Sequence, residues 1–182
     1  MSKAIGMVEY TTVAAGVFAA DLMVKTAEVD IIEAQPVCPG KYIAIITGSL
    51  SAVKAAVEAA KANGGGKLID SFVLGNPHDS LFTAIYGGCD IENPRALGIA
   101  ESYSAASMIS AADTAAKTAI VDLVELRIAR GMCGKSYMVL TGEVAAVEAA
   151  IAKAKAQLGE GGMFLDSTVI PNPDEKVWKT II

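Results

Sequence analysis

The chain repeats one sequence pattern twice along its 182 residues, and this duplication constrains the fold more than any other feature. Paired segments occur in the same order in both halves: 4–9 with 96–101, 19–27 with 111–119, Gly40 and Lys41 with Gly134 and Lys135, and Asn76 and Pro77 with Asn172 and Pro173. Chance would not keep such matches in order over a whole domain. We therefore predict two related domains, residues 1–90 and 91–182, joined by a stretch rich in turn-forming residues.

Each copy has the pattern of a small α+β domain. In the first copy, apolar runs predict strands at 4–10, 29–35, 41–47 and 68–74, and apolar residues at helical spacing predict helices over 13–27 and around 53–60. A short helix is expected after Pro77. The stretch 36–40 holds two prolines and a glycine, so no regular structure is expected there. This order predicts an α/β fold of the α+β type, with a small antiparallel-leaning sheet flanked by helices that we place on one side.

Charge and hydropathy exclude two classes of partner. The chain carries 15 Lys and Arg against 20 Asp and Glu, which argues against nucleic acid because phosphate binding needs a basic face. Hydrophobic residues make up 53%, yet no segment reaches the ~18 uncharged apolar residues that a membrane span requires. The N-terminus has no signal-peptide layout. We therefore expect a cytoplasmic, oligomeric protein without membrane contact.

The potential metal ligands and catalytic groups are few. Cys38, Cys89 and Cys133 are odd in number and widely spaced, which does not suit a disulfide framework. His78 is the single histidine, so one chain cannot assemble a zinc site, and any metal would be shared between subunits. No nucleophile, base and carboxylate form a catalytic pattern, so we do not expect an enzyme.

Three further features together resemble the bacterial microcompartment shell domain. They are AIGMVE at the start, Ala-Asp-x-x-x-Lys on the first helix, and Gly-Lys-Tyr at 40–42. Two such domains in one chain resemble the tandem class of shell proteins, which form trimers shaped as pseudohexameric tiles. The resemblance implies a structural homotrimer in the microcompartment, with other shell proteins and encapsulated redox enzymes as partners. It also implies that Lys25 and Lys117 lie at the tile edge, although a solvated lysine on a helix face is the simpler alternative.

The residues Val37, Cys38, Pro39 and Gly40 resemble the pore loop of tandem shell proteins from propanediol-utilisation compartments. In that class the equivalent cysteine binds an iron–sulfur cluster. A cyclic trimer would present three copies of Cys38 around its axis. The resemblance therefore implies one [4Fe–4S] cluster per trimer, with three Cys38 ligands and one iron left open, for electron transport across the shell. The alternative is that Cys38 is a small buried apolar residue.

The corresponding loop of the second copy contains Gly131, Met132, Cys133 and Gly134, with Arg130 at the ungapped position of Cys38. The central symmetry would then be threefold rather than sixfold, with both loops lining the pore. We interpret Cys133 as a loop thiol, but a second ring of thiols or a spare ligand stays open.

Other functions remain open at this point. The tile could supply iron–sulfur units to enzymes instead of passing electrons, or it could be a cluster-free pore for metabolites. From another class, a trimeric ligand-sensing protein of the ferredoxin-like kind would also suit the small α/β unit.

Overall fold

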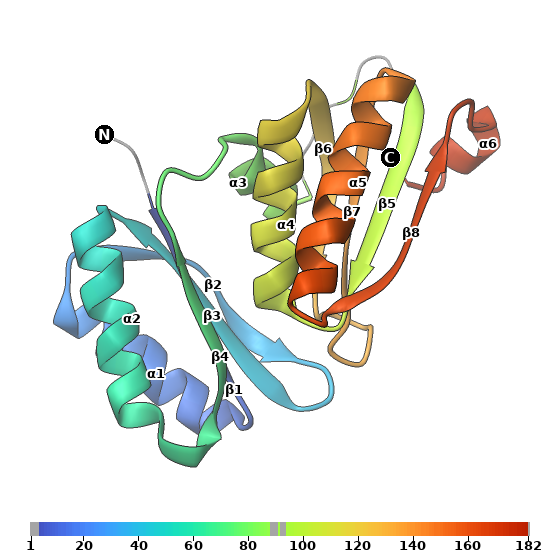
Figure 1. Cartoon of the computed structure of the whole chain (residues 1–182). Coiled ribbons are helices and arrows are strands. Elements are labelled where there is room, and N and C mark those ends of the chain that lie inside the picture. Colours follow the sequence, from blue (N-terminus) through green and yellow to red (C-terminus); the bar gives the residue numbers. More distant parts are fainter. Residues whose placement is uncertain (1–3, 88–90, 92–93, 182) are drawn as a thin grey trace. The chain divides into compact units, whose positions relative to one another are not determined.

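The chain divides into two compact units, residues 1–77 and 78–182, in a computed structural model that describes residues 4–87, 91 and 94–181 (Figure 1). Each unit holds one four-stranded sheet with helices packed on it. Within the described residues, no helix has the length and apolar character needed to cross a membrane.

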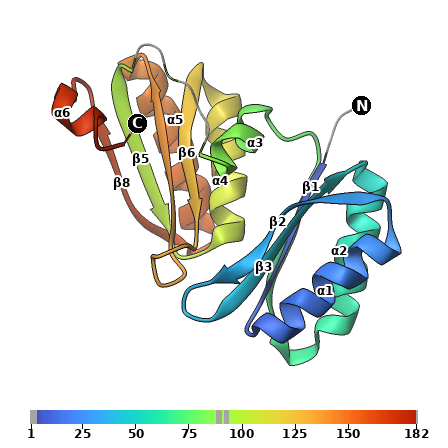
Figure 2. The same ribbon diagram turned by 180° about the vertical axis from the view of Figure 1, so that it is seen from behind.

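The first unit is a sheet in the order β2-β3-β1-β4, in which all neighbouring strands run antiparallel. Its strands are β1 (Ala4–Tyr10), β2 (Val29–Val37), β3 (Lys41–Gly48) and β4 (Leu68–Leu74). Helices α1 (Val13–Thr26) and α2 (Leu50–Gly64) pack side by side against the sheet, as Figure 2 shows from behind, and a short 3-10 turn (Gly65–Lys67) follows α2.

The second unit repeats this arrangement in the order β6-β7-β5-β8. Its strands are β5 (Ala96–Ser102), β6 (Val121–Ile128), β7 (Ser136–Gly142) and β8 (Phe164–Ile170). The long helices are α4 (Ala105–Thr118) and α5 (Val144–Glu160), and the short ones are α3 (Ser80–Ile85) and α6 (Glu175–Trp178). The predicted α+β class, an antiparallel sheet with helices in each copy, is confirmed.

The matching first helices of the two copies begin in the same way. The side chain of Thr12 accepts a hydrogen bond from the backbone N–H of Ala15, and Ser104 does the same for Ser107. Such caps satisfy a backbone donor that has no partner within the helix. Both copies therefore have a hydroxyl side chain at the position where these helices start.

The expectation that residues 36–40 lack regular structure was wrong for Pro36 and Val37. Both belong to β2, where Pro36 pairs with Tyr42 and Val37 with Lys41. Strand β2 lies at the edge of its sheet, and an edge strand tolerates proline because one row of its backbone groups has no strand partner. Composition alone did not reveal that the strand is an edge.

The expectation that all helices lie on one side of the sheet was also wrong. Trp178 of α6 is buried in a cluster with Leu97, Val124 and Val139. Leu97 alternates along β5 with Gly98, which faces α5, so the cluster lies on the sheet face opposite to that helix. Trp178 therefore anchors the last helix on the far face of the sheet.

Helix α3 is encoded by the first repeat but packs against β6 and α4 of the second unit. For this reason the compact units divide at residue 77, whereas the sequence pattern places the boundary of the repeat at residue 90. The boundary of the repeat stays a prediction.

The core of each unit depends on close contact between a helix and a glycine of the central strand. A Cβ atom on Gly98 would lie 2.7 Å from Val147 Cγ1 and 2.9 Å from Ile151 Cγ1 of α5. Gly6 has the same relation to α2, with a Cβ position 2.6 Å from Val53 Cγ1. Any larger side chain would push the helix away from the sheet.

We expect Gly98→Ala to lower the free energy of unfolding by about 1–3 kcal/mol, the usual cost of overpacking a core. Gly159→Ala is the matched control, because Gly159 lies in α5 with open space around its Cβ position, and alanine should raise stability there by up to about 1 kcal/mol. Urea unfolding followed by circular dichroism measures both. Equal stability of Gly98→Ala and the wild type would contradict the close packing.

Candidate functional site

Cys38 lies at the tip of the β2–β3 hairpin. Because Val37 pairs with Lys41, the connection consists of Cys38, Pro39 and Gly40 alone. The backbone N–H of Gly40 donates to the carbonyl of Val37 at 2.9 Å, and Gly40 has φ +104°, a conformation that favours glycine. Val37 is buried and Cys38 is partly exposed. The thiol therefore sits on a short, closed turn.

An ion pair connects the base of this hairpin to strand β1. Lys41 Nζ lies 2.8 Å from Glu9 Oε1, and the Glu9 side chain is buried. Removing one member of a buried pair leaves the other charge without compensation, which is strongly destabilising. The pair therefore holds the start of β3, and the Cys38 turn before it, against β1.

The β6–β7 loop of the second unit differs in length and conformation. Ile128 pairs with Ser136 where the first unit pairs Pro36 with Tyr42, so the extra two residues of the second copy fall in this loop. The N–H of Lys135 donates to the Met132 carbonyl at 3.1 Å. Gly131, Cys133 and Gly134 have positive φ, and the Cys133 side chain is exposed. The two loops therefore differ in length and in backbone conformation.

The predicted loop residues Val37–Gly40 lie together in the β2–β3 hairpin. The predicted residues Gly131–Gly134 lie together in the β6–β7 loop. Cys38 and Cys133 belong to different units, and Cys89 falls outside the described residues. Among the residues that the structure describes, no three metal-ligating side chains gather within the chain. The partly exposed Cys38 thiol, at the tip of its hairpin, is accessible from outside its own unit.

The two predicted edge lysines lie at equivalent places on α1 and α4. Lys25 pairs with Asp21 at 2.7 Å and Lys117 with Asp113 at 2.7 Å, each one turn earlier on its helix. Both lysine side chains remain exposed. Each pair holds its lysine along the helix surface near the C-terminal end.

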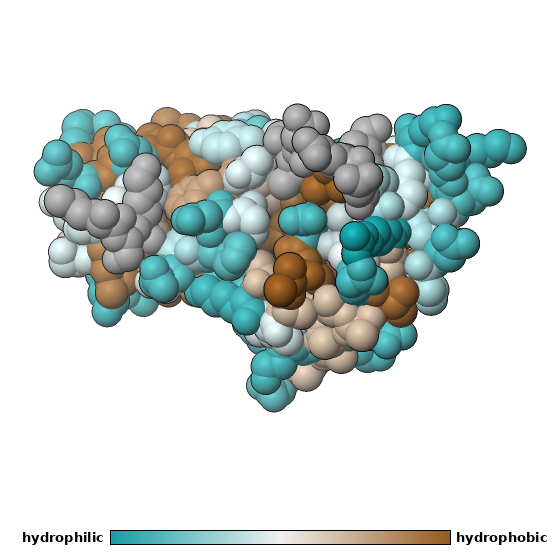
Figure 3. Space-filling model, turned by 90° about the horizontal axis from the view of Figure 1, so that it is seen from above, coloured by the Kyte–Doolittle hydropathy of each residue, from teal (hydrophilic) through white to brown (hydrophobic). Residues whose placement is uncertain are grey.

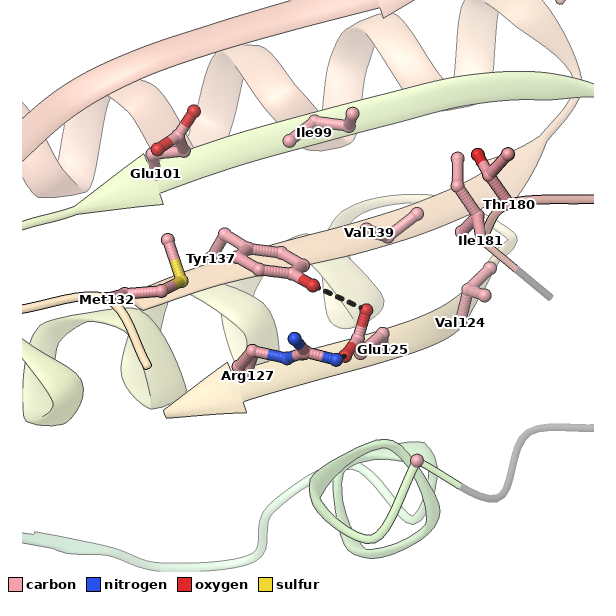
Figure 4. A pocket seen from close by; sticks show the side chains of 11 residues that line it. Ile99, Glu101, Val124, Glu125, Arg127, Met132, Tyr137, Val139, Thr180 and Ile181 are labelled. Carbon is pink, nitrogen blue, oxygen red and sulfur yellow. Dashed lines mark hydrogen bonds and ion pairs between the residues drawn. The ribbon is translucent and has the colours of Figure 1, made fainter. Parts of the chain in front are cut away.

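Sequence reasoning missed a pocket of about 750 Å³ in the second unit, shown in Figure 4. Apolar side chains including Ile99, Val139 and Ile181 line it together with Met132 of the β6–β7 loop. Its polar lining consists of Glu101, Thr180 and the three residues described next.

Glu125, Arg127 and Tyr137 form a connected cluster in this pocket. Arg127 Nη2 lies 2.6 Å from Glu125 Oε1, the Tyr137 hydroxyl donates to Glu125 Oε2 at 2.7 Å, and the guanidinium carbon is 5.6 Å from the centre of the tyrosine ring (Figure 4). Burial, and then the hydrogen bond to Glu125, raises the pKa of Tyr137 to about 12.

The first copy has Glu33, Gln35 and Ile43 at the corresponding positions, so this cluster is specific to the second copy. The sequence signal for this cluster is the difference between the two copies at these three positions. A position-by-position comparison of the copies would have revealed it.

The sequence matches the BMC domain family over residues 4–77 and again over residues 96–173. The chain belongs to the bacterial microcompartment shell proteins. It is 39% identical over 182 residues to the bacterial microcompartment shell protein PduT of Citrobacter freundii, covering 100% of this chain and 99% of that protein. The carboxysome shell protein CcmK2 of Synechocystis sp. is 36% identical over 85 residues, which cover 44% of this chain and 82% of that protein.

A solved structure agrees with this assignment over the whole chain. A microcompartment protein from Desulfitobacterium hafniense DCB has a crystal structure similar to this one, with a TM-score of 0.93 and 46% sequence identity, covering 98% of this chain and 99% of that one. The resemblance to tandem shell proteins drawn from the sequence is thereby confirmed. The family is structural rather than enzymatic, its place is the microcompartment shell, and its members assemble into oligomeric tiles with other shell proteins.

The raised pKa of Tyr137 predicts how stability depends on pH. Between pH 10 and about 12 the unfolded chain loses the phenol proton of Tyr137 while the folded chain keeps it. The contribution of this group to the free energy of unfolding is therefore complete below pH 10 and is lost as pH rises through about 12. We expect Tyr137→Phe to lose less stability than the wild type over this interval in urea unfolding. Tyr103→Phe, an exposed tyrosine of the same unit, should keep the wild-type dependence. Parallel curves for Tyr137→Phe and the wild type would disprove the assignment.

Proposed function

We propose that the chain forms a homotrimeric, pseudohexameric tile of a bacterial microcompartment shell, with the Cys38 loops meeting at the threefold axis. Two BMC domains in one chain support this, since three chains then supply the six domains of a hexagonal outline. The loops lining the centre are Val37–Gly40 of the first copy and Gly131–Gly134 of the second.

The central feature of the proposal is one [4Fe–4S] cluster per trimer, held by three Cys38 thiolates. The observation that carries it is the partly exposed Cys38 thiol on a short turn with a buried, ion-paired base. Pro39 and Gly40 shape the turn, while buried Val37 anchors it. When bound, such a cluster supplies one-electron transfer. The tile would then pass electrons across the shell to or from encapsulated redox enzymes.

The divergence of the second loop supports threefold rather than sixfold ligation. Its two extra residues and its left-handed positions give it a different path, and Arg130 occupies the ungapped position of Cys38. Three thiolates per trimer leave one iron of a four-iron cluster open to a small ligand. We assign the exposed Cys133 as a loop thiol that does not ligate the cluster.

Lys25 and Lys117 form the proposed tile edge. Both lysines are exposed, both are held by an aspartate one turn earlier, and both occur in the same sequence frame. Their duplication would give the trimer six similar edges, which a hexagonal layer requires.

The cluster is tested by replacing Cys38 with alanine. Protein purified anaerobically should be brown, with about four irons per trimer and an electron paramagnetic resonance signal after reduction. Cys38→Ala should lose colour and signal while the trimer survives, and Cys133→Ser, the matched control, should keep both. Colourless wild-type protein after anaerobic reconstitution with iron and sulfide would overturn the cluster and leave a metabolite pore.

The tile edge is tested by Lys25→Asp. Electron microscopy of concentrated wild-type protein should show hexagonally spaced sheets or tubes, and Lys25→Asp should abolish them without changing the mass of the trimer. Lys54→Asp makes the same charge reversal at an exposed lysine of α2 that the proposal does not assign to the edge, and it should leave the sheets intact. Sheets that survive Lys25→Asp would argue against the edge role.

A further inference from the structure

The same face is exposed in the first unit and buried in the second. In the first unit it consists of apolar residues of α1 and β2, which we call the α1–β2 face: Val17, Val24 and Ile31, with exposed fractions of 50%, 40% and 45%. Their counterparts in the second unit are Ile109, Ala116 and Leu123, with 0%, 7% and 0%. Figure 3 shows that hydrophobic residues reach the surface of the molecule among hydrophilic ones on the face it draws.

Helix α3 packs on this face in the second unit. It contacts β6 and α4, and its Leu81 and Ile85 are buried. Before the helix, the backbone N–H of His78 donates to Asp113 Oδ1 at 2.7 Å. The Asp113 side chain is only 6% exposed, whereas Asp21, its counterpart on α1, is 53% exposed. The first unit thus presents the same face without its cover.

Helix α6 is the counterpart of α3, because both follow an Asn-Pro pair after the last strand of their repeat. In this alignment Asp174 corresponds to His78 and Val177 to Leu81. Trp178 is buried against its own sheet, but Val177 is 41% exposed. Successive residues on a helix project about 100° apart, so α6 can be anchored by Trp178 while it offers Val177 to another surface.

We propose that a second copy of this chain docks its α6 on the α1–β2 face, as α3 docks on β6 and α4. The partner's Val177 covers Val17 and Ile31, and the backbone N–H of the partner's Asp174 donates to the carboxylate of Asp21. Helix α3, at the end of the first repeat, covers the second domain of its own chain. Helix α6, at the end of the second repeat, covers the first domain of the next chain.

This contact is head to tail, because each chain uses one surface to give α6 and another to receive it. Such heterologous contacts close into a ring when the rotation permits. The inference rests on the proposed trimer and names the surfaces that form it. It leaves the tile edge accessible, since Lys117 keeps 40% exposure with α3 in place beside it.

The two surfaces are tested by charge substitutions at their centres. Val17→Asp disrupts the α1–β2 face, and Val177→Asp disrupts the docking surface of α6. Each variant should therefore lose the trimer and elute at the mass of one 18.7 kDa chain in size-exclusion chromatography with light scattering. Leu50→Asp, on an equally exposed apolar residue of α2, is the control and should remain trimeric. Circular dichroism verifies that every variant is folded.

Mixing the two variants distinguishes head-to-tail docking from other contacts. Val17→Asp still has an intact α6, and Val177→Asp still has an intact α1–β2 face, so the mixture should form a heterodimer that cannot close into a ring. If each face instead paired with itself, mixing would restore nothing, and that result would overturn the proposal.

Failure of this inference is distinguishable from failure of the proposed function. A trimeric wild type whose Val17→Asp variant also stays trimeric would refute the docking surface and leave the tile intact. A wild type that forms an assembly other than a trimer, yet depends on Val17 and Val177, would refute the threefold tile and keep the docking. A monomeric wild type would refute both.

Discussion

The packing of a long helix over a glycine of the central strand is the contact on which each unit depends. Gly6 and Gly98 admit α2 and α5 so closely that a methyl group would collide with valine side chains. The hydroxyls of Thr47 and Thr141 add matching bonds, each donating at 2.9 Å to the carbonyl of the first residue in the central strand. The β2–β3 and β6–β7 connections lie outside these contacts, and they differ between the two copies.

The two copies differ in one loop and in one face. The β2–β3 turn has three residues and carries Cys38, while the β6–β7 loop is longer and borders a pocket that contains Glu125, Arg127 and Tyr137. The α1–β2 face is exposed, while its counterpart lies beneath α3. A chain with identical copies would have neither distinction. Divergence within the repeat would therefore allow the proposed centre, shared by three chains, and the proposed directional contact between neighbouring chains.

Much of the fold could be predicted because strands and long helices here follow local periodicity. The strand at 4–10 and the helix from Val13 were found to within a residue. The prediction failed at Pro36, where an edge position overrides the usual effect of proline, and at α6, whose side of the sheet depends on Trp178 reaching a distant cluster. The Cys38 loop was singled out by resemblance, but the pocket was not, since its residues come from separate strands.

The sequence by itself determined the duplication, the family and the residues that differ between the copies, because these are properties of order along the chain. Only the tertiary structure decided that α3 leaves its own repeat to cover the second unit and that Val17 and Ile31 are exposed. Burial depends on which distant segment packs against a surface. Two faces of nearly the same sequence can therefore be buried in one unit and exposed in the other.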